Sequence, residues 1–411
     1  MFTHKSNFLR SFFPLLLTYF IDNFGLAVVY PIFAPLFLAP HFLFTESVTF
    51  FARTVLLGLL IASFPLAQFF GAPLIGALSD KIGRKKIFII TIIGGIIGYT
   101  LTGMGIHYRE IHVLMIGRAW TGFFAGNLTL CLAAIADIST SDANRTKNFG
   151  WIATVGGLSF ILAIFIGGSF ANPKLQALFS PGLPFFLTAI FSVVNLFVII
   201  FLFKESHVVD PNKKIHVVRG LESLMSIIEH QKVRWIYLSY FLFMITWVTS
   251  MQFLSAFLIH AYSASIDLIT LTFVLIGLIW SSSNFLINPL LTKMFQASRT
   301  FFLMLLSLGI LLLLTLIPDN MVFFLINFLL ATFCAALSWT NGLATVSLSA
   351  PKSIQGGILG INQSIAAIAS ISGPLIGGLI GGYDIHLIYL FTGICSGAGA
   401  LVLYFRVIKK A

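Results

Sequence analysis

The chain has 411 residues, of which 58% are hydrophobic and only 9% are charged, and its formal net charge is +11. A soluble globular chain averages about 25% charged residues, and a disordered chain is poor in apolar residues, so this composition excludes both classes. The positive charge is compatible with nucleic-acid binding and with membrane topology, and the positions of the basic residues distinguish the two.

Twelve long apolar runs follow one another along the chain, and each is long enough to cross a bilayer as a helix, which takes about 20 residues. Two of them carry a single charge: run 11–45 contains Asp22, and run 111–136 contains Arg118. Membrane barrels use shorter segments of alternating polarity, so the predicted fold class is an all-α membrane protein with twelve transmembrane helices. The other ten runs cover residues 54–79, 87–108, 148–173, 175–203, 235–266, 268–292, 300–318, 320–351, 353–383 and 385–405.

The basic residues fall mainly on one side of the predicted membrane. An even number of spans places both termini on the same side, and 20 of the 24 Lys and Arg residues lie there, with three on the other side and Arg118 within a span. Positively charged loops stay in the cytoplasm. Both termini are therefore predicted to be cytoplasmic, and the charge gives no reason to expect a nucleic-acid partner.

The longest polar stretch, residues 204–234, separates the spans into two groups of six. The predicted domains are an N-terminal six-helix bundle over residues 1–203 and a C-terminal six-helix bundle over residues 235–411. Apolar residues within the linker, between positions 221 and 228, recur at helical spacing. This spacing is typical of an interfacial amphipathic helix, and a solvated linker is the alternative.

Two ionisable residues lie deep inside predicted spans: Asp22 among the carboxylates and Arg118 among the basic residues. Such a group costs about 2.5–3.5 kcal/mol on insertion scales, so each is expected to face a water-filled cavity or a partner. The functional interpretation is a proton or substrate site, in which Asp22 loads and releases a proton as the cavity opens to either side. The alternative is a structural polar contact between helices.

No pattern typical of an enzyme, a metal site or an ATP-driven pump is found in the sequence. Walker-type loops, GxSxG and HExxH are absent, and Cys131, Cys334 and Cys395 lie in apolar runs without metal-ligand spacing. His112 and His260 lie near the outer ends of spans and are interpreted as loop or interface residues rather than as a proton relay. We therefore expect no enzyme activity, no cofactor and no metal, with a proton gradient as the energy source.

The loop between the second and third spans carries the most specific motif. Residues 76–86 read Gly-Ala-Leu-Ser-Asp-Lys-Ile-Gly-Arg-Lys-Lys and resemble the loop 2–3 signature of the major facilitator superfamily, G-x-L-[SA]-D-[RK]-x-G-R-[RK]-[KR], at every specified position. Gly76 is expected to allow close helix packing and Gly83 a tight turn, Asp80 to cap a helix N-terminus, and Arg84 to pair with Asp137. The resemblance implies the major facilitator fold and a cytoplasmic gate formed by Gly76, Asp80, Gly83, Arg84, Lys85 and Asp137.

Spans one and four carry two further similarities. The string from Arg118 to Gly126 is similar to the family pattern R-x-x-x-G-x-x-x-[GA]. The string Asp22-Asn-Phe-Gly, followed by Pro31 and Pro35, resembles the opening helix of the drug/proton antiporter branch, which includes tetracycline efflux pumps. The resemblance implies roles for Asp22 and Arg118 in proton coupling and conformational switching.

Span five departs from the antiporter pattern. The signature of that branch reads roughly G-x-x-x-x-x-G-P-x-x-G-G, whereas residues 157–168 keep the end glycines and replace the Gly-Pro pair with Ala163 and Ile164. The kink that proline would introduce is therefore expected to be absent. This departure weakens the implication of efflux by proton antiport, although not that of transport.

Two bundles of this kind are expected to rock around a cavity at the membrane midplane. Polar and aromatic residues of the spans are the candidates to line it, although uncharged amides in membrane helices often serve only as interhelical hydrogen bonds. With one anion and one cation, the cavity suits a neutral, zwitterionic or amphipathic organic molecule. The substrate-binding candidates are Asn23, Trp247, Gln252, Asn284, Trp339, Asn341 and Gln363.

Three functions are compatible with these residues. The first is proton-coupled efflux of drug-like molecules or secreted metabolites, and the second is proton-coupled import of a nutrient, which the altered span-five string favours. The third is a membrane scaffold or receptor without transport, against which the loop 2–3 motif and Asp22 both argue. Short loops favour the bacterial inner membrane, and we expect a monomer whose partners are a small-molecule substrate and the lipid bilayer.

Overall fold

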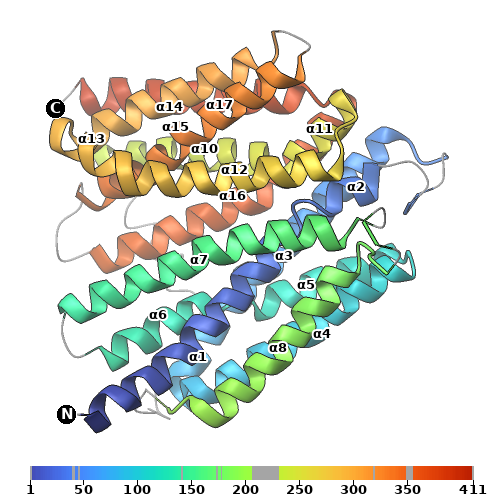
Figure 1. Cartoon of the computed structure of the whole chain (residues 1–411). Coiled ribbons are helices and arrows are strands. Elements are labelled where there is room, and N and C mark those ends of the chain that lie inside the picture. Colours follow the sequence, from blue (N-terminus) through green and yellow to red (C-terminus); the bar gives the residue numbers. More distant parts are fainter. Residues whose placement is uncertain are drawn as a thin grey trace. The chain divides into compact units, whose positions relative to one another are not determined.

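The computed structural model describes residues 2–38, 42–44, 47–139, 142–172, 175–176, 178–205, 231–317, 320–348 and 355–409. Its regular elements in these ranges are helices (Figure 1). The helices of the first half are α1 (Phe2–Ala27), α2 (Phe33–Leu38), α3 (Phe50–Ile82), α4 (Arg84–His107), α5 (Ile111–Phe124), α6 (Asn127–Ile138), α7 (Asp142–Phe170) and α8 (Leu183–Leu202). Those of the second half are α10 (Gln231–Gln252), α11 (Leu254–Tyr262), α12 (Ile266–Ser282), η1 (Ser283–Ile287), α13 (Asn288–Met294), α14 (Ala297–Leu314), α15 (Met321–Leu348), α16 (Gln355–Tyr383), α17 (Leu387–Leu403) and η3 (Tyr404–Ile408).

Each of the twelve predicted spans coincides with one helix or with consecutive helices. Nine stretches in the described ranges are long and apolar enough to cross a membrane, and α10 with α11 forms a tenth that bends by 48° at Phe253. Span one has a shorter apolar helix, Phe12–Ala27, and span four is divided between α5 and α6. The predicted all-α membrane fold is confirmed.

Contacts between residues group the chain into two compact units. The first comprises Met1–Leu36, His41–Thr45 and Ser63–Val217, and the second comprises Phe37–Pro40, Glu46–Ala62 and Val218–Ala411. The first half of α3 thus belongs with the second unit. The predicted domain division at residues 204–234 stays a prediction, because residues 206–230, including the expected amphipathic helix, lie outside the described residues.

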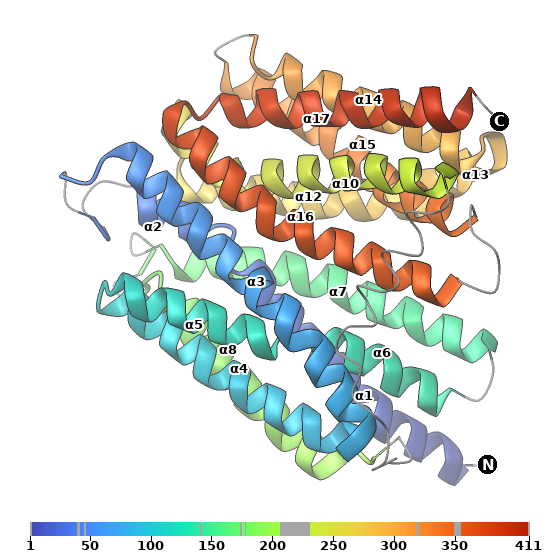
Figure 2. The same cartoon turned by 180° about the vertical axis from the view of Figure 1, so that it is seen from behind.

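Within the first unit, α4 packs against α5 and α8, while α1 packs against α6, α7 and α8. Figure 2 shows α4, α5 and α8 lying together. Within the second unit, α10 packs against α15, α16 and α17, and α14 packs against α15 and α17. The hydrocarbon of lipids is as apolar as leucine, so van der Waals packing and interhelical hydrogen bonds hold such bundles together.

Many large apolar side chains are exposed, in contrast to a water-soluble protein. Phe201 is 76% exposed and Phe285 is 80% exposed. Continuous apolar surface of this kind marks a membrane or partner interface. Because both residues lie in apolar spans, we assign these faces to the hydrocarbon of the bilayer.

Several glycines in the spans mark places where helices approach closely. A Cβ atom at Gly98 would lie 2.8 Å from the backbone nitrogen of Thr121, and one at Gly94 would overlap the Phe124 ring. In the second unit, a Cβ atom at Gly378 would lie 3.0 Å from the carbonyl oxygen of Thr54. Small residues at such contacts let backbones approach and gain packing energy.

A loop carboxylate fixes the start of the last span. The Asp384 Oδ1 atom accepts hydrogen bonds from the backbone N–H of His386 at 2.9 Å and lies 2.8 Å from His386 Nδ1. These contacts lower the pKa of Asp384 below its usual range.

We expect Asp384→Asn to lower the melting temperature slightly at pH 7. The stabilisation is fully present above the pKa of about 3.9 that an unfolded aspartate has, and it is lost as the pH falls through the lower folded value. Thermal unfolding in detergent between pH 7 and pH 4 measures this difference, which should be constant to about pH 5 and shrink below it. A difference that grows on acidification would contradict the assignment.

Candidate functional site

Span four is interrupted near its middle. Helix α5 ends at Phe124 and α6 begins at Asn127, with Ala125 at ψ 63° and Gly126 at φ −113° between them. The side-chain Nε2 of Gln68, on α3, donates a 2.6 Å hydrogen bond to the Ala125 carbonyl oxygen. Backbone groups freed inside a membrane need such partners, so Gln68 stabilises the break.

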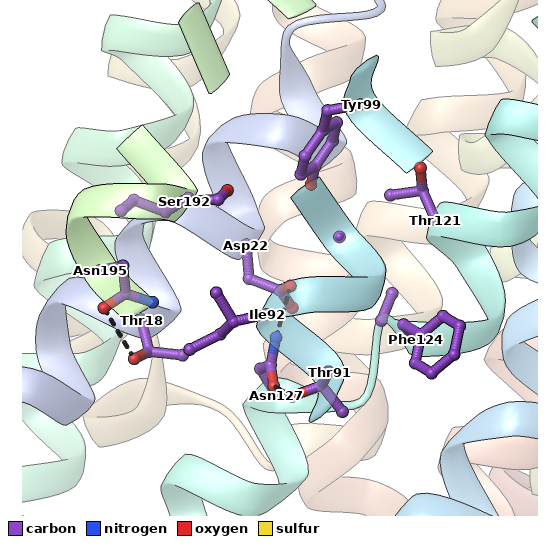
Figure 3. Close-up of a pocket in the computed structure, with 13 residues that line it drawn as sticks. Thr18, Asp22, Thr91, Ile92, Tyr99, Thr121, Phe124, Asn127, Ser192 and Asn195 are labelled. Carbon is purple, nitrogen blue, oxygen red and sulfur yellow. Dashed lines mark hydrogen bonds between the residues drawn. The ribbon is translucent and has the colours of Figure 1, made fainter. Parts of the chain in front are cut away.

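The Asp22 carboxylate lies beside this break. Asn127, the first residue of α6, donates a 3.0 Å hydrogen bond from Nδ2 to Asp22 Oδ1. The Asn127 Oδ1 atom accepts a 2.6 Å hydrogen bond from Thr91 Oγ1 on α4, which orients the amide with its NH₂ group toward Asp22. Figure 3 shows this pair, with Tyr99 approaching Asp22 from the opposite side.

Asp22 and Asn127 line a pocket within the first unit. It encloses about 330 Å³ of empty space, part of which is open to its surroundings. The part that can hold the centre of a water molecule is about 20 Å³, which is room for about one water and far too little for a drug-sized solute. Its polar lining consists of Thr18, Asp22, Thr91, Tyr99, Thr121, Asn127, Ser192 and Asn195.

Arg118 is buried and does not share this pocket. Its guanidinium carbon lies 5.3 Å from the centroid of the Phe33 ring and 4.6 Å from that of Phe64. Cation–π contacts of this kind are worth about 2 kcal/mol when desolvated. Its Nε and Nη1 atoms have no hydrogen-bond partner among the described residues, and the Asp22 carboxylate bonds to Asn127 rather than to Arg118.

The turn between α3 and α4 has the geometry that its motif predicts. Gly83 has φ 99°, a conformation that favours glycine. Arg84 Nε lies 2.6 Å from Asp137 Oδ2 at the end of α6, and Arg84 Nη2 lies 3.7 Å from Asp80 Oδ1. The predicted pairing of Arg84 with Asp137 is confirmed, and the guanidinium connects three helices of the first unit.

One part of the motif differs from expectation, and a residue outside the motif makes a contact that was not predicted. Gly76 was expected to allow close helix packing, but no described atom lies within 4 Å of the position of its Cβ. The carboxylate at the N-terminus of α4 is Glu205, which accepts hydrogen bonds from the backbone N–H of Arg84 at 3.1 Å and of Lys85 at 3.0 Å. A carboxylate is stabilising there because the first N–H groups of a helix have no intrahelical partner.

Glu205 was not among the predicted residues, although its position just after span six was a usable signal. Lys85 also reaches the end of this span, because its Nζ donates a 2.8 Å hydrogen bond to the carbonyl oxygen of Ile200. The motif is therefore connected to α8 as well as to α6.

The aromatic candidates of the second unit meet at a third tryptophan. Trp247 stacks on Trp280 at a centroid distance of 5.3 Å, and Trp339 lies edge-on to Trp280 at 6.1 Å. Trp280, on α12, was missed because nothing in its local sequence sets it apart. Gln252 lies five residues after Trp247 in the sequence. Its side-chain amide oxygen, Oε1, is buried without a hydrogen-bond partner among the described residues.

Three of the amide candidates connect helices. Asn23 Nδ2 donates a 2.7 Å hydrogen bond to the Gly156 carbonyl oxygen on α7. Asn284 Oδ1 accepts a hydrogen bond from Thr340, and Asn341 Nδ2 donates to Asn288 Oδ1 at 2.8 Å. These contacts support the structural alternative for the three amides. The side chain of the remaining candidate, Gln363, lies outside the described residues.

With this geometry established, comparison with known proteins identifies the family. The family model of the Major Facilitator Superfamily matches residues 15–320 and also residues 236–411. The chain belongs to the Major Facilitator Superfamily.

Relatives within the superfamily include tetracycline resistance proteins. The class B protein of Escherichia coli is 32% identical over 166 residues, which are 40% of this chain and 38% of the relative. The class H protein of Pasteurella multocida is 27% identical over 197 residues, 48% of this chain and 45% of the relative. The chain thus aligns with less than half the length of these relatives.

Solved structures of other transporters share the fold over nearly the whole chain. The human organic anion transporter MFSD10 has a TM-score of 0.68 at 21% identity and covers 96% of this chain and 99% of its own. A D-xylose–proton symporter has a TM-score of 0.76 at 15% identity and covers 96% of this chain and 97% of its own. At these identities the similarity establishes the fold.

We expect Arg84→Ala to destabilise the superfamily motif and to change turnover more than affinity. Arg84 is buried while Asp137 is partly exposed, so losing their ion pair should cost about 1–3 kcal/mol, between the values for exposed and buried pairs. Melting temperature and the rate and half-saturation of transport measure the two effects. Lys86→Ala, at an exposed position of the same motif, is the matched control, and a change in half-saturation alone would contradict a gating role.

Proposed function

We propose that this member of the Major Facilitator Superfamily exports a small amphipathic organic solute in exchange for protons. The observation that carries the proposal is Asp22, a carboxylate inside span one, held by Asn127 at the edge of a polar pocket. A carboxylate at that depth is costly unless it is used, and a group that can be protonated there can couple solute movement to a proton gradient.

The direction of transport is supported by the relatives. Proteins named for resistance to tetracycline match this chain at 27–32% identity, and resistance of that kind is consistent with export. The proton gradient supplies the energy, and no cofactor is needed. The proposal includes a bacterial inner membrane with both termini on its cytoplasmic side, which the basic loops favour, and a protein that acts as a monomer.

Arg84 and Asp137 form the cytoplasmic gate in this proposal. Their ion pair, together with the Glu205 contacts to the N-terminus of α4, fixes one arrangement of α4, α6 and the end of α8. A second arrangement would require these contacts to break together. The aromatic group of Trp247, Trp280 and Trp339 supplies apolar contact for the solute from the second unit.

The second candidate is proton-coupled import of a nutrient. It is favoured by span five, where Ala163 and Ile164 replace the Gly-Pro pair of the antiporter pattern. Both residues are fully buried in a single continuous helix, α7. The proline that would kink this span is therefore absent from span five.

Reconstitution tests both candidates. Purified protein is placed in proteoliposomes that contain a fluorescent pH indicator, a pH gradient is imposed, and tetracycline and a fluoroquinolone are used as probes. Opposite movement of solute and proton supports export by antiport, and parallel movement supports import. Solute flux that leaves the internal pH at the level of protein-free liposomes would contradict proton coupling.

A further inference from the structure

The interruption of span four brings a helix N-terminus to the carboxylate of span one. Residues 125 and 126 leave the helical conformation, so α6 starts anew at Asn127 beside Asp22. Had the helix continued, the backbone N–H groups at this depth would have been bonded within it. The break instead leaves them at the start of a twelve-residue helix, where the dipole favours negative charge.

Asn127 is held on both sides. Its NH₂ group donates to Asp22, its carbonyl oxygen accepts from Thr91, and it is 5% exposed. The break itself is fixed by Gln68, which donates to the Ala125 carbonyl oxygen at 2.6 Å. The amide cannot turn away from Asp22 without losing the Thr91 contact.

The other ionisable groups around Asp22 do not supply a positive partner. Tyr19 on α1, Tyr99 on α4 and Cys131 on α6 interact electrostatically with it. The side chains that α8 contributes to the pocket are the neutral Ser192 and Asn195. Among the described residues, Asn127 is the one whose side chain donates a hydrogen bond to the Asp22 carboxylate.

We propose that Asn127 is a positioning residue for proton exchange at Asp22, presented by the interruption of span four. It favours the deprotonated carboxylate by donating a hydrogen bond to it, together with the N-terminus of α6. When α6 moves relative to α1, the donor leaves and Asp22 binds a proton more tightly. This inference rests on the proposed coupling role of Asp22.

A carbodiimide tests the inference without any substrate. Dicyclohexylcarbodiimide adds to protonated carboxyl groups, so the fraction of Asp22 modified after a short exposure, measured by mass spectrometry at a series of pH values, reports its protonation. We expect Asn127→Ala to move the midpoint upward by about one pH unit, since a hydrogen bond to a charged group contributes about that much.

Three further variants make the result specific. Asn127→Asp keeps the size of the side chain, removes the donor and adds a like charge, so the midpoint should move further in the same direction. Asn195 lines the same pocket, and its side chain bonds to Thr18 rather than to Asp22. The midpoint of Asn195→Ala should therefore equal that of the unaltered protein. Asp22→Asn gives the background, and the melting temperature of each variant shows whether it is folded.

The outcomes separate this inference from the proposed function. An unchanged midpoint in both folded Asn127 variants overturns the positioning role, whether or not the protein transports protons. A shifted midpoint in protein that moves no protons in proteoliposomes supports the positioning of Asp22 and removes its coupling role. Equal shifts in the Asn127 and Asn195 variants would show that general disturbance of the pocket, rather than the donated hydrogen bond, is responsible.

Discussion

Asp22→Asn is expected to reduce proton-coupled transport to the level of protein-free liposomes. The amide has the size of the carboxylate and can still accept the hydrogen bond from Asn127 Nδ2, but it cannot take up a proton in the accessible pH range. The bundle should therefore keep its stability to within about 1 kcal/mol, the typical size of a point-substitution effect. The measurement is the change in internal pH during solute flux, together with thermal unfolding of the same preparation.

The matched control is Asp384→Asn, which makes the same chemical change in the loop before α17. It should leave coupling intact, because this carboxylate lies outside the spans. Unchanged coupling in Asp22→Asn would remove Asp22 from the mechanism, and loss of folded protein would move it to a structural role. Import driven by a proton gradient would also require Asp22. The result therefore tests proton coupling, and the flux assay in proteoliposomes tests the direction of transport.

Gly122→Leu is expected to abolish the folded bundle. A Cβ atom at Gly122, on α5, would overlap the backbone carbonyl of Phe64, on α3, and one at Gly71 would overlap the carbonyl of Phe123. The two helices therefore cross in backbone contact at two reciprocal glycines. Because the obstacles are backbone atoms, the helices must separate, which costs about 1–3 kcal/mol for modest overpacking and more for a leucine. Arg118 and the break that presents Asn127 lie on either side of this crossing.

The reactivity of the buried thiols measures the loss of the folded bundle. Cys131 and Cys334 are free and buried, so a thiol-reactive dye reports the temperature at which they become accessible. Gly122→Ala should melt several degrees lower than the unaltered protein, at the lower end of the stated cost. Gly397→Ala, at a helical glycine whose Cβ would meet no described atom within 4 Å, should be neutral or slightly stabilising. Equal melting temperatures of the two alanine variants would contradict the crossing.

Some of the site was predictable because its signals are local. The turn at Gly83 requires a residue with a positive φ. The motif around it indicated both the turn and the partner of Arg84. Asp22 and Arg118 stood out because each is a lone charge in a long apolar run. These inferences needed no knowledge of which helices are neighbours.

Other features depend on pairs of residues far apart in the chain. Gly76 was expected to pack closely and does not, while Glu205 reaches the N-terminus of α4 from the far end of span six. Asn23 is a substrate candidate whose side chain donates a hydrogen bond to α7. The sequence of a span does not distinguish a polar residue that faces a cavity from one that faces a neighbouring helix.

The sequence by itself determined the all-α membrane fold, with its succession of long apolar spans, and the loop motif, because the length and polarity of a membrane helix are set by the thickness of the bilayer. Only the tertiary structure decided that span four breaks at residues 125–126, that Asn127 rather than Arg118 bonds to Asp22, and that Arg118 contacts two phenylalanine rings. Inside lipid the backbone bonds within each helix regardless of its neighbours, so the spans can be read from the chain. Which buried polar groups meet depends on how the helices pack.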